Sequence, residues 1–287
     1  MIYSQSLKEI RDTIYTYQRK DNLENFNINI DDFKSHPYTF LKWRFYLETS
    51  SLLLFILVRT KIKPNHISLF YASLGILTLL FMSIPTENKF YLFFALFIAF
   101  TKTTIDACDG YIARLKNQKS LSGFVLDGYG AHINAIGFQC GIGFYLANYY
   151  NETFFLYLVF LIPFFYAIRL KTFAYSSLLN EIIENKYYLN SKHPFIKKEK
   201  DLENSFVSKL EKNNYKKIYS LFNSIFDDRA RSVDLIILFF LIEIIFGFKL
   251  IEYIFYFLVS KHSIIVLINL FIVSNNDWLE SKINQIR

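Results

Sequence analysis

Three aspartates stand near the ends of two consecutive apolar stretches. Asp106 and Asp109 are three residues apart, so on a helix they share one face. Asp127 lies inside the next apolar stretch, where an unpaired carboxylate is costly and should face protein, water or a cation. Carboxylates from two linked helices supply the oxygen ligands that Mg²⁺ or Mn²⁺ takes together with substrate phosphates. The spacing therefore indicates a divalent-metal site. The alternatives are a solvated helix end for the first two, and pairing with Arg114 or Lys102 for the third.

Small residues and one arginine surround these acids. Gly110, Ala113 and Gly123 allow close approach of a helix or of a ligand. Arg114 adds a positive charge eight residues after Asp106. No single one of these residues indicates a metal or ligand site, but their combination does.

The composition places these residues in a membrane protein. The 287 residues are 53% hydrophobic and 19% aromatic, with only 9 glycines and 5 prolines, and the net charge is +7. This excludes a disordered chain, a collagen and a small disulfide-stapled domain. The long apolar runs also argue against a soluble globule, and they assign the basic charge to a membrane surface rather than to nucleic acid. We expect an all-α polytopic membrane protein.

A bilayer core requires about 20 apolar residues per helix. This length predicts six membrane-spanning helices, at 66–83, 90–109, 121–149, 153–168 and two within 233–274. The turn between the last two falls at 247–252 or at 260–263. The segment 40–58 is apolar but carries Lys42, Arg44 and Glu48, which favours an interfacial helix over a further span.

Lys and Arg residues concentrate in alternate connections: 1–65, the connection after the second span, 169–231 and the C-terminal tail. The positive-inside rule then places both termini and the acidic cluster on the cytoplasmic side. We expect a cytoplasmic N-terminal region at 1–60 and a six-helix membrane domain at 61–287. A charged cytoplasmic insert at 170–232 interrupts this domain, either as short amphipathic helices near the membrane surface or as a solvated loop. The N-terminus lacks the apolar segment of a secretory signal.

The run from Asp106 to Ala131 resembles the signature of the CDP-alcohol phosphatidyltransferase family, D-x2-D-G-x2-A-R-x8-G-x3-D-x3-D. Seven of its eight fixed positions match with the correct spacing. Upstream, residues 64–68 read PNHIS and resemble the P-N-x-[IVL]-[ST] motif that opens the first span in this family. The motifs lie within 40–179, and beyond that only the number of spans agrees.

The resemblance implies an integral-membrane enzyme of phospholipid metabolism with six spans, usually a homodimer, in the inner membrane if the source is bacterial. Such enzymes transfer a phosphoryl-alcohol unit, such as a phosphatidyl group, from a CDP-linked alcohol to an acceptor alcohol and release CMP. By position, Mg²⁺ or Mn²⁺ would bind Asp106, Asp109 and Asp127. The cytidine nucleotide would lie against Asn65, Gly110, Ala113, Arg114 and Gly123.

The eighth position departs from the family pattern. The family has an aspartate there, which completes the metal cage and is the proposed base for the acceptor hydroxyl, whereas this chain has Ala131. His132 is adjacent, but one residue turns about 100° around a helix, so it is a weak candidate base and is otherwise a polar residue pairing with a neighbouring helix. Three alternatives follow: another group such as His132 is the base, the metal activates the acceptor, or the site binds nucleotide with slow or no turnover.

Two rival functions belong to other classes. A cation transporter predicts acids near the bilayer midplane and helices broken at matching points of two repeated halves. Here the acids lie at one interface and the sequence has no internal repeat. A catalytically silent homologue that binds CDP-alcohol or a partner protein is the second rival, and Ala131 is the residue that favours it.

Overall fold

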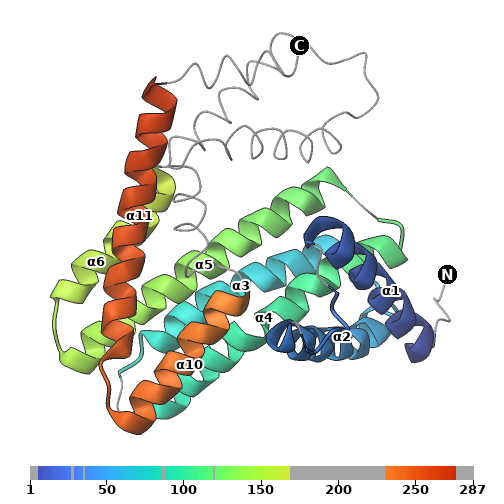
Figure 1. Cartoon of the computed structure of the whole chain (residues 1–287), viewed down its shortest axis with the longest axis horizontal. Helices are drawn as coiled ribbons and strands as arrows, with labels where there is room; N and C mark the ends of the chain where they lie inside the picture. Colours follow the sequence, from blue (N-terminus) through green and yellow to red (C-terminus); the bar gives the residue numbers. More distant parts are fainter. Residues whose placement is uncertain are drawn as a thin grey trace. The chain divides into compact units, whose positions relative to one another are not determined.

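The chain is helical throughout the part that the structure describes. The computed structural model describes residues 6–26, 29–34, 36–85, 88–118, 120–168 and 230–275. Within these ranges every regular element is a helix, which confirms the expected all-α class (Figure 1). The helices are α1 (Leu7–Phe26), α2 (Pro37–Leu57), α3 (Pro64–Met82), α4 (Lys89–Leu115), α5 (Leu121–Tyr150), α6 (Phe154–Ala167), α10 (Ala230–Phe246) and α11 (Leu250–Asn275).

These helices belong to two compact units, Met1–Tyr149 and Tyr150–Arg287. Helices α1 to α5 form the first unit, and α6, α10 and α11 lie in the second. The N-terminal helices α1 and α2 therefore pack within the same unit as α3 and α4. The domain assignment at 1–60 and 61–287 stays a prediction, and the insert at 170–232 lies outside the described residues except for its last three.

In the described part of the chain, three helices are long and apolar enough to cross a bilayer: α3, α4 and the Leu250–Leu270 part of α11. Helix α6 is apolar but shorter. Six of the helices coincide with the six predicted spans. The number of spans and the side on which the termini lie remain predictions.

The turn between the last two helices lies at 247–249, which is one of the two predicted positions. Gly247 has a φ of 75°, a backbone conformation that glycine adopts without steric cost, and its N–H donates to the carbonyl oxygen of Glu243 at 2.8 Å. The Glu243 carboxylate accepts a hydrogen bond from the backbone N–H of Ile251 at 2.8 Å. This contact satisfies an otherwise unpaired donor at the start of α11.

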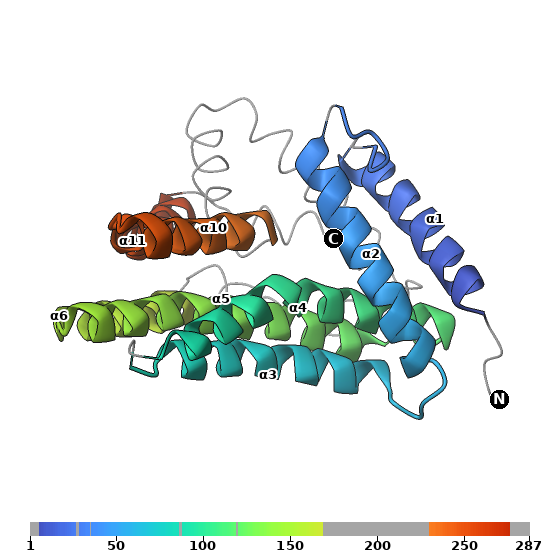
Figure 2. The same ribbon diagram turned by 90° about the horizontal axis from the view of Figure 1, so that it is seen from below.

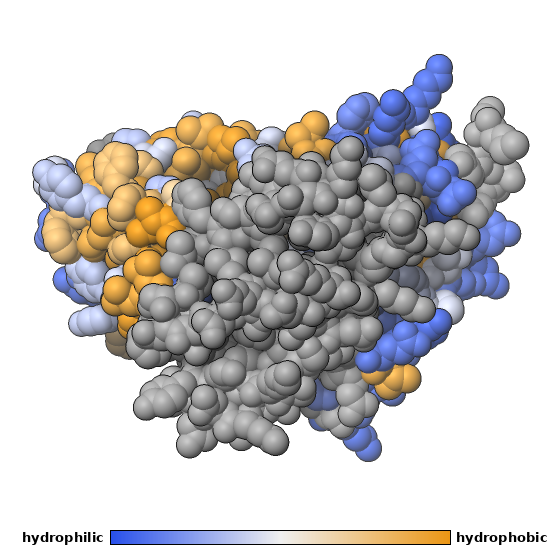
Figure 3. All heavy atoms as spheres, turned by 90° about the horizontal axis from the view of Figure 1, so that it is seen from above, coloured by the Kyte–Doolittle hydropathy of each residue, from blue (hydrophilic) through white to orange (hydrophobic). Residues whose placement is uncertain are grey.

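Helix α1 is an element that the sequence reading did not predict. Its buried face joins α2, α3 and α4 in one apolar cluster, formed by Ile10, Ile14, Tyr15, Ile30, Leu47, Leu54, Ile67, Cys108, Tyr111 and Ile112. Most of its other residues are exposed. In Figure 3 hydrophilic side chains gather at the end of the molecule where α1 lies.

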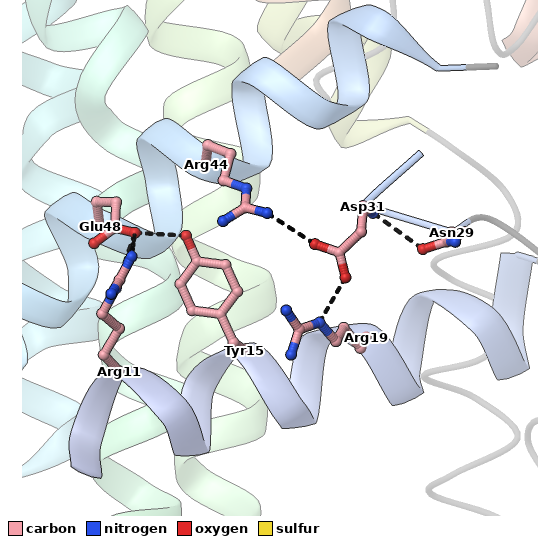
Figure 4. A network of polar contacts seen from close by, with 7 residues as sticks. All are labelled: Arg11, Tyr15, Arg19, Asn29, Asp31, Arg44 and Glu48. Atoms are coloured by element: carbon pink, nitrogen blue, oxygen red, sulfur yellow. Dashed lines mark hydrogen bonds and ion pairs between the residues drawn. The ribbon is translucent and has the colours of Figure 1, made fainter. Parts of the chain in front are cut away.

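A polar network also joins α1 to α2 (Figure 4). The carboxylate of Glu48 accepts hydrogen bonds from Arg11 Nη2 at 2.6 Å and from the Tyr15 hydroxyl at 2.7 Å. Asp31 accepts from Arg19 at 2.6 Å and from Arg44 at 3.0 Å. Two of the charges that favoured an interfacial helix at 40–58, Arg44 and Glu48, therefore bind the preceding segment.

Helices α3 and α5 approach closely in the same unit, with α4 beside them (Figure 2). A Cβ atom added to Gly137 would overlap the carbonyl oxygen of Gly75. Next to this crossing the Asn134 side chain donates to the carbonyl oxygens of Tyr71 at 2.7 Å and Gly130 at 3.0 Å. Small residues thus bring the two backbones together and an amide fixes their register.

The Glu48 network predicts that the docking of α1 depends on pH. The hydrogen bond from Arg11 lowers the pKa of the Glu48 carboxyl, so the stabilisation is complete above the unfolded pKa of about 4.3 and is lost as pH falls through the folded value. We expect hydrogen-exchange protection of α1, corrected for intrinsic rates, to fall about two- to fivefold from pH 6 to pH 3.5.

The Glu48→Gln variant is the control for this measurement. It should show weaker protection at pH 6 and a smaller change with pH. Equal protection of α1 at both pH values in the unmodified chain would contradict the assigned role of Glu48.

The helix crossing predicts opposite outcomes for two glycines of α5. Gly137→Ala should lower the stability of the first unit by about 1–3 kcal/mol, because the added methyl group meets backbone atoms that cannot move aside. Gly128→Ala is the matched control: no atom lies within 4 Å of its added Cβ, and alanine favours helix by up to about 1 kcal/mol. Thermal unfolding in detergent micelles measures both, and equal melting temperatures would refute the crossing.

Candidate active site

The ends of three helices meet where the sequence motifs lie. Helix α3 begins at Pro64, a residue suited to the first turn because it lacks an N–H. Helix α5 begins after Ser120, whose hydroxyl accepts the backbone N–H of Gly123 at 3.0 Å and so acts as an N-cap. The amide of Asn65 donates to the Ser122 hydroxyl at 3.4 Å. The starts of α3 and α5 therefore lie beside one another, and the connection from α4 to α5 is short.

Two of the three predicted acids touch. The carboxyl groups of Asp106 on α4 and Asp127 on α5 lie within hydrogen-bonding reach of each other. Asp109 is close enough to interact electrostatically with both. The side chain of Asp127 is exposed and that of Asp106 is half-buried. The structure thus brings the acids of the second and third predicted spans together.

Asp109 is the most enclosed of the three, with 7% of its surface exposed. Its Oδ2 atom accepts a hydrogen bond of 2.6 Å from the hydroxyl of Ser68, which is itself buried in the first turns of α3. A hydrogen bond to a charged group is among the stronger polar contacts in a protein. Ser68 therefore orients Asp109, and it is the last residue of the PNHIS motif.

The chemistry of this cluster fits a divalent cation only in part. Two carboxylates in hydrogen-bonding contact repel each other unless a proton or a cation lies between them, and the ligand atoms are oxygens, as Mg²⁺ requires. Lys102 on α4 interacts electrostatically with Asp106. However, among the described residues no group of three or more Asp, Glu, His or Cys side chains is arranged to hold a metal ion. The structure shows Asp106 and Asp127 as a pair, while the Asp109 carboxylate accepts its hydrogen bond from Ser68.

The predicted nucleotide-binding residues lie around the acids. A Cβ atom added to Gly123 would lie 3.1 Å from the Ser120 hydroxyl and 3.2 Å from the Asn65 side-chain oxygen. A glycine is therefore needed for the close approach of α3 and α5 at this point. Ala113 lies one turn of α4 after Asp109.

Arg114 lies in a corner between two aromatic rings. The centre of its guanidinium is 4.0 Å from the ring of Tyr17 on α1 and 4.7 Å from the ring of Tyr111 on α4. A Cβ atom added to Gly110 would be 3.4 Å from the nearest guanidinium nitrogen. The space that Gly110 leaves open is therefore bordered by Arg114, which also interacts electrostatically with Asp109.

Lys116 joins the end of α4 to the connection between α2 and α3. Its ammonium group donates to the carbonyl oxygens of Leu57 at 3.3 Å, Thr60 at 2.9 Å and Ile62 at 2.9 Å. Loss of hydration lowers the pKa of this amine. These bonds tie the connection between α2 and α3 to the end of α4, just before the PNHIS motif.

The position without the expected aspartate lies on α5. Ala131 is half-buried and His132 is exposed. Asn134, the nearest amide one turn on, is committed to the backbone contacts with α3. The role of His132 as a base stays a prediction.

Comparison with known proteins relates the segment that contains this site to one family. Residues 61–178 match the model of the CDP-alcohol phosphatidyltransferase family. The match begins shortly before α3 and includes both sequence motifs. A search among curated proteins found no match. The match agrees with the resemblance that the two sequence motifs indicate.

Several contacts around the site did not follow from the sequence reading. Ser68 was noted as part of a motif, but its bond to Asp109 depends on the packing of α3 against α4. Ser120 precedes an apolar helix by one residue, which is a recognisable N-cap signal. Nothing in the local sequence relates Tyr17 to Arg114, because the two residues lie on helices far apart in the chain.

Proposed function

We propose that the chain is a membrane phosphotransferase that moves a phosphoryl-alcohol unit, such as a phosphatidyl group, from a CDP-alcohol to an acceptor alcohol and releases CMP. The contact between Asp106 and Asp127 is the observation that carries this proposal. It joins the two halves of the family motif on neighbouring helices, beside a third acid held by Ser68. We further propose that the site faces the cytoplasm and that the chain acts as a homodimer.

In this proposal, different residues of the site bind different parts of the CDP-alcohol donor. Asp106, Asp109 and Asp127 would hold Mg²⁺ or Mn²⁺, which when bound neutralises the diphosphate and the leaving phosphate. Arg114 presents N–H groups with the geometry that matches phosphate oxygens. The lack of a side chain at Gly110 and Gly123 leaves backbone accessible to the nucleotide.

The reaction exchanges one phosphorus–oxygen bond for another. The acceptor hydroxyl oxygen attacks the phosphorus that bears the alcohol, the bond to the bridging oxygen breaks, and CMP leaves with that oxygen. The acceptor proton must pass to a base. Ala131 has no group that accepts a proton, so His132 or another base must take it, or the rate must fall by the 10²–10⁴-fold that a general base typically contributes.

A silent homologue that binds CDP-alcohol without efficient turnover is the second candidate. Ala131 is the specific observation that favours it. The two candidates share the same binding site and differ only in the final proton transfer.

A CMP-release assay separates these candidates. Purified protein in nanodiscs with Mg²⁺ or Mn²⁺ should release CMP from CDP-diacylglycerol when a suitable acceptor from an alcohol panel is added, and Asp106→Asn should abolish release.

If the missing base limits the rate, Ala131→Asp should raise release by about 10²–10⁴-fold. If His132 is the base, His132→Ala should lower release by a similar factor, and Ala131→Asp should add little. Failure of every variant to bind CDP-diacylglycerol or to release CMP would overturn the transferase proposal.

Ser68 provides a second test through Asp109. Ser68→Ala removes the donor at 2.6 Å and leaves a buried carboxylate without it, so we expect CMP release to fall about tenfold or more. Ser73→Ala is the matched control on the same helix, because the Ser73 hydroxyl donates to the carbonyl oxygen of Phe70 in its own helix. The prediction is wrong if both variants retain the rate of the unmodified chain.

A further inference from the structure

The ring of Tyr17 reaches the proposed site from outside the family-matched segment. Helix α1 lies before residue 61, where the family match begins. Tyr17 lies in the middle of this helix, and its ring is 6.2 Å from that of Tyr111 at an interplanar angle of 85°. The guanidinium of Arg114 occupies the corner between these two rings. An element of the N-terminal region thus touches a residue of the signature.

Two independent sets of contacts hold α1 in this place. Ile10 and Ile14 are almost completely buried in the apolar cluster shared with α2 and α4. Next to them in the sequence, Tyr15 donates to Glu48, and Arg11 pairs with the same carboxylate. Tyr17 itself is 40% exposed. Its position is therefore set by neighbours on the helix and not by its own burial.

The contact leaves the hydrogen-bonding capacity of Arg114 available. Among the described residues, the Arg114 guanidinium forms no ion pair within 4.0 Å and donates no side-chain hydrogen bond; it contacts the two rings and interacts electrostatically with Asp109. A guanidinium group is attracted to the face of an aromatic ring, whereas phosphate oxygens are bound by the N–H groups in the plane of the guanidinium. The rings can thus restrict the guanidinium without competing with an anionic ligand.

We propose that Tyr17 is a positioning residue for Arg114, so that α1 prepares the site for the diphosphate of a CDP-linked substrate. This inference rests on the proposed function. The aromatic ring is the feature that matters, and the hydroxyl of Tyr17 is dispensable for this role. Arg114 touches the substrate, and Tyr17 acts through Arg114 alone.

Substitutions at Tyr17 test the proposal in the full-length chain in nanodiscs. Tyr17→Leu should raise the KM for CDP-diacylglycerol about three- to tenfold and weaken CDP binding by the same factor, which is the effect of losing one cation–π contact. The kcat should change less than twofold. Tyr17→Phe retains the ring and should stay within about twofold of the unmodified chain. Leu23→Ala, at an exposed position on the same helix, is the control for a general effect on α1.

A double-mutant cycle distinguishes positioning from helix packing. In an Arg114→Gln background, Tyr17→Leu should not weaken CDP binding further, whereas a packing role would weaken it equally in both backgrounds. Equal CDP affinity in the unmodified chain and in Tyr17→Leu would overturn the inference. Absence of CDP binding in the unmodified chain would instead overturn the proposed function, so the two failures are distinguishable.

Discussion

The close crossing of α3 and α5 is the constraint on which the site depends. The two helices run side by side, and they are linked at three levels: Asn65 to Ser122, Asn134 to Tyr71, and Asn148 to the carbonyl oxygen of Ser83 at 2.8 Å. Within a bilayer, association of helices gains little from the hydrophobic effect, so small residues and amide hydrogen bonds carry a larger share. With this register fixed, the motif at the start of α3 and the aspartate of α5 must lie at the same end.

The acidic cluster combines carboxylates of different exposure. Asp109 is buried and oriented by one hydroxyl, whereas Asp127 remains exposed on the neighbouring helix. Burial fixes the Asp109 carboxylate in place, and exposure leaves the Asp127 carboxylate accessible. The cluster thus has one carboxylate enclosed by protein, at Asp109, and one open to approach, at Asp127. Such an arrangement suits the proposed binding of a charged substrate.

The sequence predicted the helices more fully than their contacts. Apolar runs of bilayer length located α3, α4, α5, α6, α10 and α11, because hydrophobicity over many residues is a strong signal. The spacing of the motif residues also predicted that Asp106 and Asp127 lie close together. Helix α1 was missed because its apolar stripe is narrow and its exposed face is polar, and tertiary packing rather than local preference stabilises it. The bonds of Ser68, Lys116 and Tyr17 join residues distant in the chain, so no local pattern could reveal them.

The docking of α1 also has a consequence for the order of assembly. The ribosome delivers α1 and α2 before any other helix of the first unit, so Ile10 and Ile14 have only α2 as a folded surface to cover them during early synthesis. The remaining wall of their cluster, Cys108, Tyr111 and Ile112, arrives with the last turns of α4. Until then the contacts open to α1 are those with α2, through Leu47 and Leu54 and through the ion pair of Arg11 with Glu48. The ion pair of Arg11 with Glu48 thus joins two helices that the ribosome completes in succession.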